Sequence, residues 1–420
     1  MNSRERIVSA LNHRTPDKLP VDFGGTSTSG VHASVVYKLR QYFGLDQPGT
    51  PVKIIEPYQM LGEVKDDLKQ VMGVDVVNIS GPGTFFGFKK ENWKPWRLWD
   101  GTPLLVPVKF NIVINNDGSF FQYAEGDKNY PPAALLPKNG YFFDSLRRQK
   151  PFKEGELNPY DNTEEFQPLS IDDLKYIYDD TEEKYKNTEY ALIGSVAASG
   201  FGDIAFIPGP MLKEPKGIRD VAEWYISTLT RKDYVKKVFE IQCEIAIENY
   251  RRIHDLVGDK ITAMFVSGTD FGTQDRLFSS VDTYKQLFKP FHFKVNNWIH
   301  ENTGWKSFIH TCGAVKELLQ EFIEAGFDII NPVQISAAGM DPYKLKKEYG
   351  KYLTFWGGGV DTQKTLALGS AAEVKEQVKK MIGIFNNDGG FVFSTVHNIQ
   401  ANVPIENVIA MIEIIKQYRH

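Results

Sequence analysis

The chain has 420 residues and a formal net charge of −4 at pH 7, with 42% hydrophobic and 24% charged residues. This balance is typical of a globular protein with a sizeable core, and it gives no general attraction to nucleic acid or to anionic membranes. No apolar run approaches the roughly 18 to 20 residues of a membrane span. The opening segment reads as an amphipathic helix with Ile7, Val8 and Leu11, not as a signal peptide. Two cysteines cannot form a disulfide framework, so we expect a reducing, cytoplasmic location.

Short β-rich apolar runs alternate with longer helical segments along the chain, which is the pattern of parallel βα units. Eight runs are predicted strands: Lys18–Phe23, Val74–Ser80, Tyr190–Val196, Ile261–Ser267, Lys306–His310, Asp328–Val333, Tyr352–Trp356 and Gly390–Ser394. Helices are predicted after the last five: Val281–Glu301, Val315–Ala325, Pro342–Tyr349, Ala371–Phe385 and Pro404–Tyr418. Eight such units predict a single α/β domain over residues 1–420, a (β/α)8 TIM barrel. An open doubly wound sheet is the alternative, but no Gly-x-Gly-x-x-Gly follows the first strand.

The region from about residue 81 to residue 168 interrupts this alternation. Two β-rich segments, Thr102–Ile114 and Ser119–Glu125, flank Asn115-Asn116-Asp117-Gly118, whose residue types tolerate the positive φ of a hairpin turn. We therefore predict a β-hairpin inserted after the second strand, followed by a loop, with the whole insertion covering the mouth of the barrel. An insertion there can shape a substrate pocket, and a homodimer contact or a loop without a function is an equally good interpretation.

The fifth predicted strand ends in His310-Thr311-Cys312-Gly313. In barrels of this kind the reacting groups lie where strands end. Residues two apart in an extended segment point to the same side, so the imidazole of His310 and the thiol of Cys312 can converge. His397, just past the eighth strand, would complete three zinc ligands and leave a fourth position open. The alternatives are a buried, inert cysteine and a surface or helix-capping histidine. The other cysteine, Cys243, lies in a helical pattern and is predicted to be a core residue.

Other strand ends also carry candidate residues. Asp270 and Gln274, after the fourth strand, are candidate catalytic residues that orient substrate or support the metal ligands, although Asp270 could instead cap the next helix. Candidates for cofactor binding follow the seventh strand: Gly357, Gly358, Gly359 and Asp361. The backbone N–H groups of such glycines can bind phosphate, but no Walker sequence follows, and close backbone packing is the simpler explanation.

These motifs together resemble the uroporphyrinogen decarboxylase superfamily, and more closely its zinc-dependent corrinoid methyltransferase branch, which includes the methylcobamide:coenzyme M methyltransferases. The resemblance covers nearly the whole chain. It rests on Ser3-Arg4-Glu5-Arg6, Arg14-Thr15-Pro16-Asp17-Lys18-Leu19-Pro20-Val21, Asp270-Phe271-Gly272-Thr273-Gln274, His310-Thr311-Cys312-Gly313, Asn331-Pro332-Val333-Gln334, Trp356-Gly357-Gly358-Gly359-Val360-Asp361 and the 390–397 segment. The His-x-Cys-Gly sequence is the feature that points to the methyltransferases.

The resemblance implies zinc held by His310, Cys312 and a third ligand after the last strand, where those enzymes carry a cysteine and this chain carries His397. One thiolate fewer leaves the metal a stronger Lewis acid, which favours O-methyl or N-methyl compounds over thiols. The implied reaction moves a methyl group between a small O-, N- or S-methyl compound and a corrinoid, either free or on a partner protein.

Two other functions stay open. The decarboxylases hold porphyrinogen carboxylates with arginines after the first strand, whereas this chain has no arginine between Arg14 and Arg40. A porphyrinogen decarboxylase is therefore the second hypothesis. A barrel that binds a corrinoid or tetrapyrrole without catalysis is the third.

Overall fold

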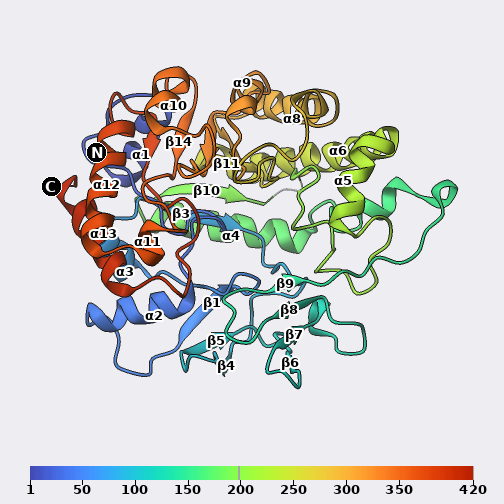
Figure 1. Ribbon diagram of the computed structural model, residues 1–420, viewed down its shortest axis with the longest axis horizontal. Coiled ribbons are helices and arrows are strands. Elements are labelled where there is room, and N and C mark those ends of the chain that lie inside the picture. Colours follow the sequence, from blue (N-terminus) through green and yellow to red (C-terminus); the bar gives the residue numbers. More distant parts are fainter. Residues whose placement is uncertain (197–198, 420) are drawn as a thin grey trace.

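The computed structural model describes residues 1–196 and 199–419, and a parallel sheet forms its centre (Figure 1). Seven strands lie in the spatial order β15-β14-β13-β12-β11-β10-β3. Their bounds are β3 Val76–Ser80, β10 Ala191–Ser195, β11 Ile261–Ser267, β12 Lys306–His310, β13 Ile329–Asn331, β14 Thr354–Trp356 and β15 Phe391–Val392. The parallel pairing and the helices that cover it make this a TIM-barrel-like α/β fold, as the sequence predicts.

The first predicted strand, Lys18–Phe23, is reduced to a single bridge at Val21. Val21 pairs in parallel with Phe393 next to β15, and its carbonyl accepts the N–H of Asp75 next to β3 at 2.8 Å. This residue therefore joins the two edges of the seven-stranded sheet. The strand stays short because Pro20 has no N–H to donate to a ladder.

Helices pack around the outside of the sheet and follow the predicted boundaries closely (Figure 1). They are α1 Ser3–Leu11, α2 Ala33–Tyr42, α3 Asp66–Met72, α4 Ile171–Asn187, α5 Val221–Thr230, α6 Lys232–Val257, α7 Val281–Thr283, α8 Lys289–Asn302, α9 Leu319–Glu324, α10 Pro342–Tyr349, α11 Thr365–Leu368, α12 Ala371–Phe385 and α13 Ile405–Gln417. A π-helical turn, Tyr284–Phe288, separates α7 from α8 and interrupts the predicted helix Val281–Glu301. Ser370 begins α12 with a capping box formed with Glu373, which explains why that boundary could be predicted. Cys243 in α6 is fully buried, as predicted.

Aromatic side chains fill the barrel interior below the strand ends. The ring of Phe308 lies 5.4 Å from that of Phe265 and 5.3 Å from that of Trp356, between centroids. The indole N–H of Trp356 donates to the buried carboxylate of Asp22 at 2.7 Å. Because aromatic rings occupy the interior at this level, we expect the polar residues of a functional site at the strand ends above them.

The predicted insertion contributes strands to two small sheets, one of which also contains β1 and β2 from before β3, so the arrangement is larger than the single hairpin that the sequence predicts. One sheet has the order β2-β1-β5-β4 and the other β6-β7-β8-β9. The strands are β1 Val52–Glu56, β2 Leu61–Gly62, β4 Lys94–Arg97, β5 Pro103–Val106, β6 Val113–Ile114, β7 Phe120–Gln122, β8 Ala134–Leu136 and β9 Asp144–Ser145. The turn at 115–118 does join β6 to β7, but Pro107 ends β5 and divides the predicted strand Thr102–Ile114 between the two sheets.

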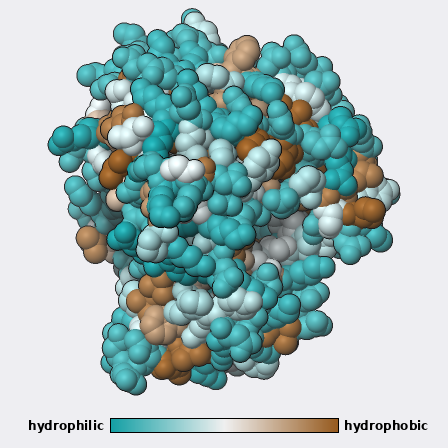
Figure 2. All heavy atoms as spheres, turned by 90° about the vertical axis from the view of Figure 1, so that its right-hand side faces the viewer, coloured by the Kyte–Doolittle hydropathy of each residue, from teal (hydrophilic) through white to brown (hydrophobic). Residues whose placement is uncertain are grey.

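The lobe formed by residues 52–62 and 94–145 lies at the bottom of Figure 1, and Figure 2 shows the surface hollowed between this lobe and the barrel. Gln59, after β1, contacts loops at the carboxyl ends of the barrel strands. Its amide donates to Ser27 O at 3.0 Å and accepts from Asn398 Nδ2 at 2.6 Å. The described residues contain no helix long and apolar enough to cross a membrane.

Candidate metal centre

His310 and Cys312 converge as the strand geometry predicts. His310 is the last residue of β12, and the extended chain continues because Thr311 N–H donates to Asn331 O at 2.7 Å. Thr311 points the other way and accepts the N–H of Phe271 through its hydroxyl. The Sγ of Cys312 consequently lies 3.5 Å from Nε2 of His310.

Asn331 on β13 determines which nitrogen of His310 is free. Its Nδ2 donates to Trp356 O at 2.8 Å, which fixes the orientation of the amide. Its Oδ1 accepts from Thr28 Oγ1 at 3.2 Å and lies 2.6 Å from His310 Nδ1. The proton of the neutral imidazole therefore belongs on Nδ1, which leaves the lone pair of Nε2 directed toward Cys312.

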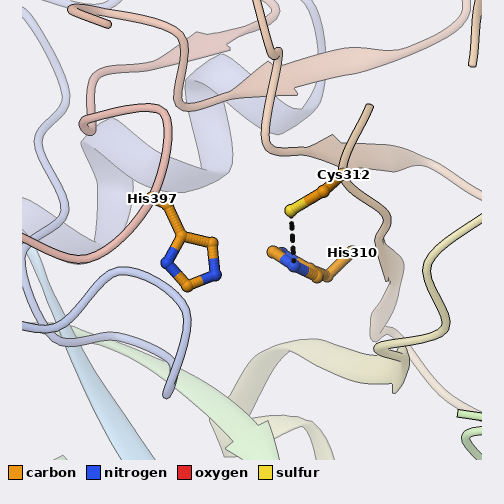
Figure 3. A group of neighbouring side chains, drawn as sticks. All are labelled: His310, Cys312 and His397. Atoms are coloured by element: carbon orange, nitrogen blue, oxygen red, sulfur yellow. Dashed lines mark hydrogen bonds between the residues drawn. The ribbon is translucent and has the colours of Figure 1, made fainter. Parts of the chain in front are cut away.

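His397 reaches the same place from the other side of the barrel. Its loop is held on both flanks, since Val396 N–H donates to Val360 O at 3.0 Å and Gly30 N–H donates to Asn398 Oδ1 at 2.6 Å. The rings of His310 and His397 are 5.5 Å apart between centroids, at 71°. Figure 3 shows the ring of His397 facing both the ring of His310 and the thiol of Cys312.

The electrostatics of the three side chains suit metal binding. Burial lowers the pKa of His310 to about 4, and burial together with the neighbouring His310 lowers that of His397 to about 4, so both rings are neutral at pH 7. Burial and the nearby carboxylate of Asp270 raise the pKa of Cys312 well above its ordinary value. The nitrogen lone pairs of His310 and His397 are thus available to zinc without loss of a proton, whereas Cys312 must lose its thiol proton to bind.

These residues fit zinc. One ligand atom from each of the three lies within 4.8 Å of the other two. Tetrahedral bonds of about 2.1 Å to nitrogen and about 2.3 Å to sulfur place the two atoms about 3.6 Å apart, close to the 3.5 Å between His310 and Cys312. Three protein ligands of the types N, S and N leave a fourth coordination position for a substrate.

Asp270 supports the motif from the neighbouring strand end. Its Oδ1 accepts the N–H of Cys312 at 2.6 Å and lies 3.9 Å from Nε2 of His310. Burial raises the pKa of this carboxyl. Of the two predicted catalytic residues, Asp270 is therefore placed against the candidate ligands.

Gln274, the other predicted catalytic residue, is exposed, and its backbone carbonyl accepts the N–H of Ala338 at 2.9 Å. A different glutamine, Gln334, is buried and accepts the N–H of Gly313 at 2.6 Å. Gly313 has φ +93°, and a Cβ there would lie 2.3 Å from Gly272 O, so the motif needs glycine where the two loops meet. Gln334 and Asn331 were not predicted as site residues, although both belong to the Asn-Pro-Val-Gln stretch that begins at the last residue of β13.

The glycines after β14 are buried between neighbouring strands. A Cβ on Gly358 would lie 2.7 Å from Cβ of Val333, and one on Gly359 would lie 2.3 Å from the ring of Phe393. Asp361 is also buried, and its Oδ1 accepts the N–H of Gln363 at 2.9 Å within its own turn. Packing accounts for these residues, including Gly357, whose Cβ would lie 3.0 Å from Thr395 O. Their role in cofactor binding stays a prediction.

Replacing Asn331 tests how far the amide positions His310. In Asn331→Ala the Nδ1 proton loses its acceptor, and we expect zinc affinity to fall about 10-fold to 100-fold, the usual effect of removing a partner of a metal-binding histidine. Asn331→Asp keeps an acceptor oxygen and should restore most of the affinity. Competition with a chelator measures both variants, and histidine nitrogen NMR reports the tautomer directly. A folded alanine variant with the parent's zinc affinity and tautomer would show that Asn331 has no such role.

The fold and the site together define a class: a TIM-barrel-like protein with a His/Cys/His cluster at the carboxyl ends of its strands. The model of the family Uroporphyrinogen decarboxylase (URO-D) matches residues 150–418. The chain therefore belongs to the URO-D family. No curated protein matches the chain.

One solved structure supports the fold. A methyltransferase from Methanosarcina mazei is similar over 100% of this chain and 99% of its own, with 14% identity and a TM-score of 0.55. The Ignisphaera aggregans GH53 catalytic domain is similar over 95% of this chain and 99% of its own, with 10% identity and a TM-score of 0.36. The first likeness shows the barrel fold, and the second adds nothing further.

Proposed function

We propose that the protein is a zinc-dependent methyltransferase that moves a methyl group between a small O-, N- or S-methyl compound and a corrinoid. The observation that carries the proposal is the convergence of His310, Cys312 and His397, with one ligand atom of each within 4.8 Å of the others. Membership of the URO-D family and the fold shared with a methyltransferase support it. The corrinoid, free or held by a partner protein, comes from the sequence resemblance, and the cytoplasmic setting comes from the presence of only two cysteines in the sequence.

The chain's own residues would hold and prepare the site. His310 and His397 offer neutral nitrogens, and Cys312 offers a thiolate once its proton is lost. Asp270 positions Cys312 through its backbone N–H. Zinc, when bound, supplies a Lewis acid of net charge about +1, which favours a donor that leaves as an anion. With one thiolate instead of two the metal would be a harder Lewis acid, which suits an ether oxygen or an amine nitrogen better than a thioether sulfur.

The segment after the first barrel strand argues against the decarboxylase hypothesis. Thr26, Ser29 and Thr28 form a network of hydroxyl contacts there, with Thr26 Oγ1 2.9 Å from Thr28 Oγ1 and 3.2 Å from Ser29 Oγ. Neutral hydroxyls hold a polycarboxylate less well than arginine forks do. A small methyl compound does not carry many carboxylates and therefore does not need several arginines to bind it.

Zinc analysis and methyl-transfer assays test the proposal together. We expect about one zinc per chain and methylation of reduced cobalamin by at least one compound from a panel of methyl ethers, methylamines and methyl thioethers. Removal of the metal should abolish transfer, and added zinc should restore it. The same preparation incubated with uroporphyrinogen should form no coproporphyrinogen. Porphyrinogen decarboxylation without methyl transfer would instead establish the second hypothesis, and zinc-independent transfer would contradict the proposed role of the metal.

A further inference from the structure

A lysine side chain lies at the carboxyl end of β3, apart from the three candidate ligands in the sequence. The ammonium of Lys90 donates to Ser80 Oγ at 3.0 Å. Ser80 is the last residue of β3, and in the parallel register it lies beside Ser195, the last residue of β10. One ammonium group and two hydroxyl groups thus gather where two neighbouring strands end.

The backbone fixes this placement. After β3 the chain turns back on itself, with Thr84 N–H donating to Phe88 O at 2.8 Å and an antiparallel bridge between Gly83 and Lys89. Lys90 N–H then donates to Pro82 O at 2.9 Å. This hairpin returns Lys90 to the end of the strand that it has just left, so its position does not depend on a long flexible loop.

The strand registers place the two serines on the inner face of the barrel. Ser195 lies two residues after Ile193, which pairs with Ala263, and Phe265 lies two residues after Ala263. Phe265 pairs with Phe308 on β12, and His310 lies two residues further. Because side chains two apart share a face, the serines and His310 face the same interior. Their strands all end at the same mouth.

The ammonium of Lys90 has no carboxylate within 4 Å among the residues that the structure describes. Burial, followed by the charge of Lys184, lowers its pKa to about 8. The carboxylates of Asp180 and Glu56 act on it only through space. Asp180 pairs with Lys184 at 2.8 Å, and the two oxygens of Glu56 accept the N–H groups of Tyr58 and Gln59 at 2.9 and 2.7 Å. A partly buried cation without a close counter-ion is costly, and such groups gather at binding sites.

The hydroxyl of Ser195 also indicates a binding site beside Lys90. Its oxygen is buried and has no hydrogen-bond partner among the described residues. A buried hydroxyl without a partner carries a free-energy penalty that a ligand can remove. One cation with two hydroxyls matches a group that carries a single negative charge and two acceptor oxygens, which describes a carboxylate.

We propose that Lys90, Ser80 and Ser195 bind the carboxylate of the small methyl compound whose methyl group reacts at His310, Cys312 and His397. This inference rests on the proposed function and names its substrate class, methylated aromatic carboxylic acids. The aromatic part follows from Phe265, a half-buried ring on the inner face at the level of Ser195. Phe265 also stacks on His310, with 6.3 Å between centroids, so a flat body would span the two groups of residues.

Calorimetric titration in the absence of corrinoid tests the carboxylate site by itself. The probes are the 2-, 3- and 4-methoxybenzoates and the matching methoxybenzyl alcohols, which have the same ring and ether but no charge. We expect the parent to bind at least one acid more tightly than its alcohol. Lys90→Met should weaken binding of that acid by at least about tenfold and change binding of the alcohol less than about twofold. Lys89→Met, at the exposed neighbouring residue, is the matched control and should bind like the parent.

Titrating zinc-loaded and metal-free protein separates this inference from the proposed function. A parent without zinc affinity would contradict the proposed function, whereas a loss of acid binding in Lys90→Met that persists in metal-free protein would still support the carboxylate site. The melting temperature of Lys90→Met should not fall, because the substitution removes a partly buried charge. A parent that binds none of the acids, or equal weakening of acid and alcohol in the variant, overturns the inference.

Discussion

Cys312→Ser should lose zinc. Serine keeps the size of the side chain but replaces a thiolate, which zinc binds well, with a hydroxyl that stays protonated at neutral pH. We expect zinc affinity to fall by at least about tenfold and methyl transfer to fall with it. Chelator competition followed by metal analysis measures the affinity.

Cys243→Ser is the control for this substitution. Cys243 is the other cysteine of the chain, and it is fully buried in α6 among core residues. Its loss should cost some stability, since a hydroxyl enters an apolar site, but zinc affinity should stay at the parent's value. Zinc retained in Cys312→Ser, or lost equally in both variants, would remove Cys312 from the metal centre.

Strand positions could be predicted where local sequence and tertiary pairing agree. β11 and β12 run over the predicted residues because neighbouring apolar side chains, Met264 and Phe265 in β11 and Phe308 and Ile309 in β12, point to both faces of a sheet that is covered on both sides. The first strand could not be predicted at its true length. Its pattern suits a strand, but Pro20 and the short pairing of Val21 with Phe393 limit it to a bridge. Strand propensity indicates which segments can form a strand, while the segments beside them determine how many of their residues pair.

In the candidate metal site, too, local spacing predicted some features while tertiary contacts determined the others. The spacing of His310 and Cys312 on one strand end was enough to predict that they meet, because the period of an extended chain is local. His397 also lies where the fold requires, since the last strand ends at the same mouth. The partners that orient these ligands, Asn331 and Gln334, come from β13 and the loop after it. Their role depends on side-chain direction across the strand ends, which the sequence alone does not contain.

Gln274 shows that closeness to Asp270 in the sequence does not predict a shared site. The sequence places it four residues after Asp270, and both were predicted to serve catalysis. The chain turns between them, so that Asp270 meets Cys312 while Gln274 is exposed. A loop reverses direction within three or four residues, so neighbours in sequence need not share a site.

Zinc affinity should rise about tenfold for each pH unit between pH 6 and pH 8. The metal-free protein holds a proton on Cys312, whose pKa is raised well above its ordinary value, and zinc binds the thiolate. Below that pKa, each unit of pH lowers the thiolate fraction tenfold. His310 and His397 add nothing in this range, because their pKa values of about 4 leave both rings neutral. The slope of log affinity against pH should therefore be one.

The proton count gives an independent measure of the same effect. Calorimetry of zinc binding in two buffers of different ionisation enthalpy should report about one proton released per zinc at pH 7. Histidines with an ordinary pKa of about 6.5 would instead steepen the slope toward three near pH 6 and release additional protons there. Such a result would mean that the two rings are solvated and apart in the metal-free protein, contrary to their burial. A slope near zero, with no proton released, would mean that Cys312 is already a thiolate or is not a ligand at all, and Cys312→Ser distinguishes these two cases.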